Sequence, residues 1–346
     1  MDLSYSVHIG DYCTLPEDES IVEKEAKITM EFSRDQVVAV GQAIFVTVLW
    51  ASSWVIIKFG LENENLPPLT FSGLRYTFAS VILLGVIIAN SEYRIAVKSM
   101  NRRWWGVLIV YGVVFVTITQ GAQFVGLFFL DAIMVSALLN LTPIIVLFMG
   151  AVYLKELPTR YQTAWIILGV IGAMLYFYPL DFISQSLFGI IVVLIGVIAN
   201  AFSSIIGRYV NKERVAPPLV ITGISMAIGA FLLLGSGLLI ERLETVTPLA
   251  WIYILWLAIV NTAFAFTLWN KAMQTLRAVD MTIINSTMLP QIVILSIIFL
   301  GENPTPLDWV GLILLALSVA FVQISQARRA NSNSNKIKSQ SVEDKL

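Results

Sequence analysis

The chain has 346 residues, of which 57% are hydrophobic and 13% are charged, and its formal net charge is −1. Soluble domains average about 45–50% apolar and about 25% charged residues, so most of this surface must face lipid, and a nearly neutral chain has no general attraction for nucleic acid. The one cysteine, Cys13, and the one histidine, His8, exclude a disulfide framework and argue against a His or Cys metal site or Ser-His-Asp catalysis.

Ten long apolar runs dominate the sequence. A helix needs roughly 20 apolar residues to cross the hydrocarbon core of a bilayer. The runs therefore predict an all-α integral membrane protein with about ten transmembrane helices. The predicted spans are residues 36–58, 69–90, 104–128, 132–154, 161–178, 187–207, 218–240, 249–270, 281–300 and 309–327.

Polar tails flank these spans. Residues 1–33 and 328–346 are expected to be disordered, and the first lacks the basic region and cleavable apolar stretch of a signal peptide. Lys and Arg gather in the links after the even-numbered spans, whereas the opposite links hold only Lys58 and Arg242. The positive-inside rule then predicts that both termini are cytoplasmic.

The two halves of the membrane part repeat each other. The matching pairs are 150 or 146 positions apart: Pro67 and Pro217, Pro68 and Pro218, Gly73 and Gly223, Trp105 and Trp251, Glu156 and Glu302. The pattern predicts one five-helix repeat in residues 34–180 and another in residues 185–327. Because five is odd, the second copy must enter the membrane from the other side. Such inverted repeats are typical of alternating access around a site near the midplane, although duplication alone would also build a symmetric bundle without a transport cycle.

Four segments resemble a known family when they are taken in order. They are LWASSWVIIKF in the first span, LPPLTFSGLRYTFAS in the second, LNLTPIIVLFMGAVYLKELPTRYQ across the fourth and fifth, and LPQIVILSIIFLGENPT in the ninth. This order resembles the paired EamA units of the drug/metabolite transporter superfamily. Trp50-Ala51-Ser52 departs from the Trp-Gly-Ser that such proteins commonly have. The resemblance implies export of amino acids, drugs or related metabolites through a cavity formed mainly by spans one, three, four, six, eight and nine.

Polar and aromatic side chains inside the spans are the candidates for substrate binding, because unpaired polar groups are costly in lipid. Neutral donors and acceptors mixed with aromatic rings suit a zwitterionic or aromatic solute. Each residue could instead simply bond to a neighbouring helix, which contributes about 0.6–2 kcal/mol. The candidates are Trp50, Ser53, Trp54, Arg75, Gln120, Gln123, Asn140, Asn200, Ser204, Asn261, Trp269 and Asn285.

Three features leave alternatives open. Arg75, the one cation well inside a span, either attracts an anionic group of the substrate or snorkels to the interface. Pro143 and Pro290 interrupt their helices, as hinges, binding points or simple kinks. Glu156 and Glu302 lie at helix ends and are expected to tie gates or loops rather than to bind solute.

These features together predict a secondary transporter, not an enzyme, which exports a small organic metabolite from the cell across the plasma (inner) membrane. We expect no cofactor, no metal and no nucleic-acid partner; the partners are a small-molecule substrate and membrane lipid. A sugar or nucleotide-sugar carrier and, with less support, an intramembrane enzyme are the alternatives. The sequence leaves open the substrate, the direction, the coupling ion and whether the chain forms a homo-oligomer.

Overall fold

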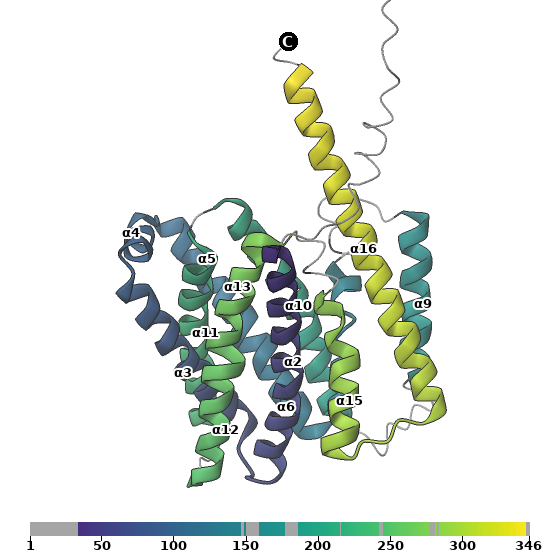
Figure 1. The fold of residues 1–346 in the computed structure, drawn as a ribbon. Helices are drawn as coiled ribbons and strands as arrows, with labels where there is room; N and C mark the ends of the chain where they lie inside the picture. Colours follow the sequence, from purple (N-terminus) through teal and green to yellow (C-terminus); the bar gives the residue numbers. More distant parts are fainter. Residues whose placement is uncertain are drawn as a thin grey trace, which may run out of the picture.

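A computed structural model describes residues 34–146, 149, 159–176, 186–214, 216–241, 245–276, 281 and 284–343, with side chains at all of these positions except 208, 211, 212, 273, 274, 323 and 326–343. Every regular element among them is a helix (Figure 1). The first half contains α2 Arg34–Glu62, α3 Pro68–Ala89, α4 Ser91–Ser99, α5 Arg102–Gly112, η1 Val113–Gln120, α6 Gly121–Phe129, α7 Ala132–Leu139 and α9 Arg160–Tyr176. The second half contains α10 Leu187–Lys212, α11 Pro218–Ile240, α12 Pro248–Ala258, η2 Ile259–Phe264, α13 Ala265–Thr275, α15 Met288–Leu300 and α16 Pro306–Glu343.

The ten predicted spans correspond to ten helical segments. Six are long and apolar enough to cross a membrane, and three shorter apolar helices (Ala132–Val146, Ile284–Leu300 and Pro306–Val322) and α9 accompany them. The third and eighth spans are continuous through α5, η1 and α6 and through α12, η2 and α13. The start of α2 and the C-terminal part of α16 lie at the same end of the bundle (Figure 1). We call this the near end and the opposite one the far end.

Two features differ from the sequence prediction. A short helix, α4, follows α3 because Asn90 ends one helix and caps the next, its side chain accepting the N–H groups of Glu92 and Tyr93. The residues after 327, predicted to be a disordered tail, continue α16 as a helix to Glu343, since no proline or glycine follows Gly311 to end it. The tail 1–33 and Glu156 lie outside the described residues.

The second span of each repeat packs against its counterpart, α3 against α11, more extensively than any other described pair of helices. A Cβ at Gly73 would lie 2.5 Å from the Cα of Leu234, and a Cβ at Gly223 would lie 3.4 Å from the Cβ of Leu83. The start of each helix therefore meets the later part of the other. This reciprocal antiparallel crossing is what an inverted repeat requires.

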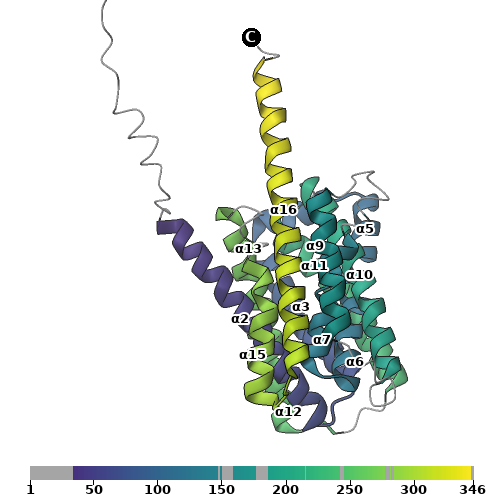
Figure 2. The ribbon, with the colours of Figure 1, turned by 90° about the vertical axis from the view of Figure 1, so that its right-hand side faces the viewer.

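The fifth and tenth spans, α9 and α16, pair in the same antiparallel way at one edge of the bundle (Figures 1 and 2). A Cβ at Gly172 would lie 2.9 Å from the carbonyl oxygen of Gly311, and a Cβ at Gly311 would lie 2.6 Å from that of Gly172. The first span packs against the eighth and ninth, and the sixth packs against the third and fourth. The contacts of one repeat thus reproduce those of the other.

Each repeat also carries a π-helical segment in its third span. η1 begins at Val113 and η2 at Ile259, 146 positions later, which is the spacing of the repeat. In both, a threonine hydroxyl bonds the carbonyl five residues before it: Thr119 to Val114 at 2.8 Å and Thr262 to Leu257 at 2.8 Å. Single-turn π segments are often found at functional sites.

The close approach of α11 to the third span gives the first prediction. A Cβ at Gly229 would lie 2.2 Å from the backbone oxygen of Gly112 and 2.6 Å from the Cβ of Val116, whereas a Cβ at Gly235 on the same helix meets nothing within 4 Å. We expect Gly229→Ala to push these helices apart and to cost about 1–3 kcal/mol, seen as a lower Tm in detergent. Gly235→Ala is the matched control and should leave the Tm equal or higher, because alanine favours helix. Equal Tm values for the two variants would contradict the described crossing.

Candidate functional site

Polar and aromatic side chains line the contacts between the spans of one repeat and those of the other. We call this set of side chains the seam. On one side α2 faces η2, α13 and α15, and on the other α10 faces η1, α6 and α7. Because the bilayer offers no hydrogen-bond partner to these side chains, their contacts inside the bundle define what the seam can bind.

Asn261 of η2 joins the eighth span to the first. Its side chain is fully buried, and its Nδ2 group donates to the carbonyl oxygen of Leu49 and lies 3.1 Å from the hydroxyls of Ser52 and Ser53. Its Oδ1 atom is buried without a hydrogen-bond partner. Asn261 and Ser53, both predicted site residues, are thus in direct contact.

Arg75 of α3 points into the protein rather than to the interface. It is 5% exposed, and its Nε–H donates to the hydroxyl of Thr262 at 3.0 Å. The guanidinium carbon lies 5.1 Å from the ring centroid of Tyr76 and 5.9 Å from that of Phe124. Tyr76 donates its O–H to the amide oxygen of Gln120 at 2.7 Å, which brings two predicted residues, Arg75 and Gln120, to one cluster.

Aromatic rings continue the seam through the first, eighth and third spans. Trp50 lies 5.0 Å from Trp269 and 5.3 Å from Phe266, between ring centroids, and Phe266 lies 6.4 Å from Phe115, which stacks on Tyr111 at 5.4 Å. All five side chains are half-buried. Aromatic pairs at these distances contribute about 0.5–1.5 kcal/mol beyond burial.

Two members of this aromatic set, Trp50 and Trp269, are among the candidates predicted from the sequence. Phe115, Phe266 and Tyr111 are not. The i, i+4 spacing of Tyr111 and Phe115 is the signal that could have found them. Trp54, another candidate, four residues after Trp50 in the same span, is 5% exposed and packs in the apolar core.

The first span of each repeat contacts the fourth span of the other repeat through an amide and a hydroxyl group. Asn200 of α10 donates its Nδ2–H to the hydroxyl of Thr142 at 3.2 Å, and Gln291 of α15 donates its Nε2–H to the hydroxyl of Thr47 at 3.1 Å. Both contacts lie beside interrupted helices. The helical pattern breaks at Asn140 and Leu141, before Pro143, and at Thr287, before Pro290.

The other predicted residues have no hydrogen bond to another helix among the described residues. Asn140 donates to the carbonyl oxygen of Ser136 at 2.9 Å, and the exposed Ser204 donates to that of Asn200 at 2.8 Å, each within its own helix. Gln123 and Asn285 are half-buried. Four buried polar atoms of the described residues have no partner: Thr77 Oγ1, Asn261 Oδ1, Gln291 Oε1 and Ser296 Oγ.

At the far end of the bundle, two carboxylates cap helix N-termini. The carboxylate of Glu302, after α15, accepts the N–H groups of Ala132 at 2.8 Å and Ile133 at 3.0 Å, which open α7. Glu241, after α11, accepts those of Leu69 at 2.9 Å and Thr70 at 2.7 Å, which open α3. The positive end of each helix dipole favours such a carboxylate. Both contacts join one repeat to the other. The sequence predicts that Glu302 ties gates or loops, and in the structure it caps the start of a helix, α7.

The electrostatics of Glu302 are mixed. Burial raises the pKa of its carboxyl above the ordinary value of 4.5, while the N–H groups of Ile133 and Ala132 oppose this rise. Asp131 raises the pKa further, and Lys58 lowers it. Lys58 itself is paired with Glu62 at 2.7 Å.

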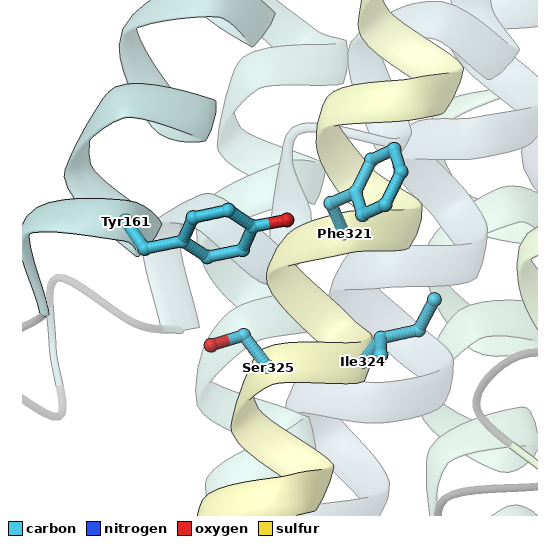
Figure 3. Close-up of a pocket in the computed structure, with 4 residues that line it drawn as sticks. All are labelled: Tyr161, Phe321, Ile324 and Ser325. Carbon is cyan, nitrogen blue, oxygen red and sulfur yellow. The ribbon is translucent and has the colours of Figure 1, made fainter.

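A cavity of about 230 Å³ lies apart from the seam, between α9 and the near-end part of α16 (Figure 3). Tyr161, Phe321, Ile324 and Ser325 line it. The described residues include no group of three or more His, Cys, Asp or Glu side chains that could hold a metal ion.

Comparisons with known proteins agree with this architecture. Residues 38–178 and 187–324 each match the sequence profile of the family described as "EamA-like transporter family". The chain is 26% identical over 248 residues to the "Uncharacterized transporter YoaV" of Bacillus subtilis, covering 68% of this chain and 79% of that protein. It is 26% identical over 297 residues to a "Probable amino-acid metabolite efflux pump" of Escherichia coli, covering 79% of this chain and 90% of that protein. A solved crystal structure shares the fold with a TM-score of 0.59 and 16% identity, over 84% of this chain and 99% of that one.

The second prediction concerns the Glu302 cap. Glu302→Ala leaves the N–H groups of Ala132 and Ile133 without their carboxylate, and we expect a loss of about 1–3 kcal/mol, measured as a lower Tm in detergent. Glu92→Ala, on the exposed surface of α4, is the control and should change the Tm little. A Glu302→Ala protein as stable as this control would show that the cap does not hold the far end.

The pH dependence of stability tests the same residue. Because the folded-state pKa of Glu302 is raised, the folded state binds more protons than the unfolded state above pH 4.5, so its contribution to stability is lost as the pH rises through that raised pKa. The Tm of the wild type should therefore fall more steeply than that of Glu302→Gln as the pH is raised from 4.5. Parallel curves would contradict the buried position of this carboxyl.

Proposed function

The chain belongs to the EamA-like transporter family, and from that premise we propose that it is a secondary transporter that exports a small organic metabolite, such as an amino acid, a drug or a related compound, by alternating access. It is an integral, multi-pass membrane protein. The observation that carries the proposal is the paired set of contacts between spans: Gln291 with Thr47, and Asn200 with Thr142. Two related interfaces of this kind, on opposite sides of one seam, support alternating access, because the inverted repeats relate the two sides to each other.

We place the near end, with both termini, in the cytoplasm of the cell. The basic residues support this orientation, since Arg94, Lys98, Arg102 and Arg103 lie on α4 and at the start of α5, at the near end. The far end is then external. The cap made by Glu302 there joins α15 to α7, which supports a state closed on the external side.

The substrate proposal rests on the chemistry of the seam. Amide and hydroxyl groups next to half-buried rings suit a solute with both polar and apolar parts. The Escherichia coli relative carries a name that refers to amino-acid metabolites, which is consistent with that class. A nucleotide-sugar carrier has less support, because a diphosphate calls for several cations and Lys58 is already paired with Glu62.

Transport kinetics test the seam. Trp50→Ala removes the ring that contacts Trp269 and Phe266, and we expect it to raise the half-saturation concentration for export from proteoliposomes by about two- to tenfold. The substrate is first found by counterflow with amino acids, sugars and amphipathic drugs. Trp256→Ala is the matched control, because Trp256 is 51% exposed on the eighth span. Unchanged kinetics in Trp50→Ala at equal protein level would place the pathway elsewhere.

Cysteine labelling tests the orientation. In a Cys13→Ser background, which removes the one native cysteine, a cysteine at Asn63 in the far-end link should react with an impermeant maleimide added outside intact cells. A cysteine at Ser99, on α4 at the near end, should react only after the cells are opened. The reverse pattern would overturn the orientation proposed here.

A further inference from the structure

Arg75 is a buried cation that makes one hydrogen bond to the described part of the chain. A guanidinium has five N–H donors. In the described part of the chain its one hydrogen bond runs from Nε to Thr262, and no carboxylate contacts it; the ion pair found there joins Lys58 and Glu62. The faces of Tyr76 and Phe124 provide only partial compensation for its charge.

The internal repeat shows that the helix crossing does not need this charge. The position that matches Arg75 in the second repeat, 150 residues later, is Ser225. Ser225 is fully buried in α11 and bonds the carbonyl of Ile221 in its own helix at 2.7 Å. α3 and α11 take matching roles in the fold, yet only one carries a cation. The charge of Arg75 therefore calls for a reason other than packing.

The contacts of Arg75 hold its guanidinium in one orientation within the seam. Thr262, its acceptor, belongs to the π segment η2 and is fully buried beside Asn261, which is bonded to the first span. Tyr76, whose ring centroid lies 5.1 Å from the guanidinium carbon, is fixed by its bond to Gln120. A planar cation held through Nε leaves its two Nη groups in a fork, which is the geometry that matches a carboxylate.

We propose that the Nη groups of Arg75 bind a carboxylate of the exported solute, so that the substrates of this transporter are small organic carboxylates. This inference rests on the proposed transport function. A single carboxylate fits better than a phosphate ester, because one guanidinium balances one negative charge. The solute supplies the anion that the described residues do not, and it balances the charge of the buried cation when the site is filled.

Matched pairs of solutes test the proposal with the full-length chain in proteoliposomes. Each pair differs only at the carboxyl group: phenylalanine with phenylalaninamide, and leucine with leucinamide. The wild type should prefer the carboxylate of each pair. Arg75→Gln should reduce that preference by about tenfold or more, the loss expected for one charge-assisted hydrogen bond, and Arg75→Lys should retain part of it.

Two further variants separate binding from folding. Arg103→Gln is the control, since this guanidinium bonds Tyr209 at 3.0 Å at an exposed position, and it should keep the full preference. Thr262→Val preserves side-chain shape but removes the acceptor of Nε, so Thr262 is tested as a positioning residue. It should lower the preference by raising the half-saturation concentration for the carboxylate more than for the amide, even if Arg75→Gln does not fold.

The outcomes distinguish this inference from the function on which it rests. The carboxylate site alone is overturned if the wild type moves both members of each pair equally. It is also overturned if Arg75→Gln keeps the full preference for the carboxylate. If Arg75→Gln does not fold, an unchanged preference in Thr262→Val overturns it. A folded wild type that moves no member of the pairs and no other solute in the counterflow panel overturns the transport function, and the carboxylate site with it.

Discussion

The whole seam depends on one constraint of the bilayer: a polar group in the hydrocarbon region must find its hydrogen-bond partner inside the protein. The Nδ2 group of Asn261 meets this constraint by bonding Leu49 and lying against Ser53, which fixes the eighth span against the first. The next residue, Thr262, accepts the Nε–H of Arg75. A single buried amide therefore orders both the polar cluster and its cation.

The internal duplication supplies a common frame, and the differences between its copies supply the chemistry. The close backbone crossings recur in both repeats, as do the π segments and the interrupted helices. The side chains of the seam do not: Trp50 matches Asn200 at the 150-residue spacing, and Asn261 matches Phe115 at the 146-residue spacing. A symmetric frame with asymmetric side chains suits a carrier, because access must alternate between two sides while one kind of solute is bound.

Local sequence signals predicted the spans, the repeat and the inverted arrangement. The lengths of the apolar runs and the positions of proline and glycine can be compared directly between the two halves of the sequence. The aromatic set was less predictable. A π turn inserts a residue into the helical period, so a face extrapolated at 3.6 residues per turn is wrong beyond it. Trp54 shows a second limit of prediction from sequence. Its i, i+4 spacing from Trp50 places both side chains on one face of the helix, but only tertiary packing decides which of them is buried in the core.

The kinds of contact also indicate where the protein can move. α3 with α11, and α9 with α16, meet backbone to backbone at glycines, and such close-packed pairs resist sliding. Among the described residues, one amide–hydroxyl bond joins the sixth span to the fourth and one joins the ninth to the first, next to interrupted helices. At the far end the cap of Glu302 joins the ninth span to the fourth. Each of these bonds costs little to exchange for a partner in a second arrangement. Rearrangement between access states is therefore expected in this second set of spans, which encloses the seam, while the glycine-packed pairs act as the fixed support.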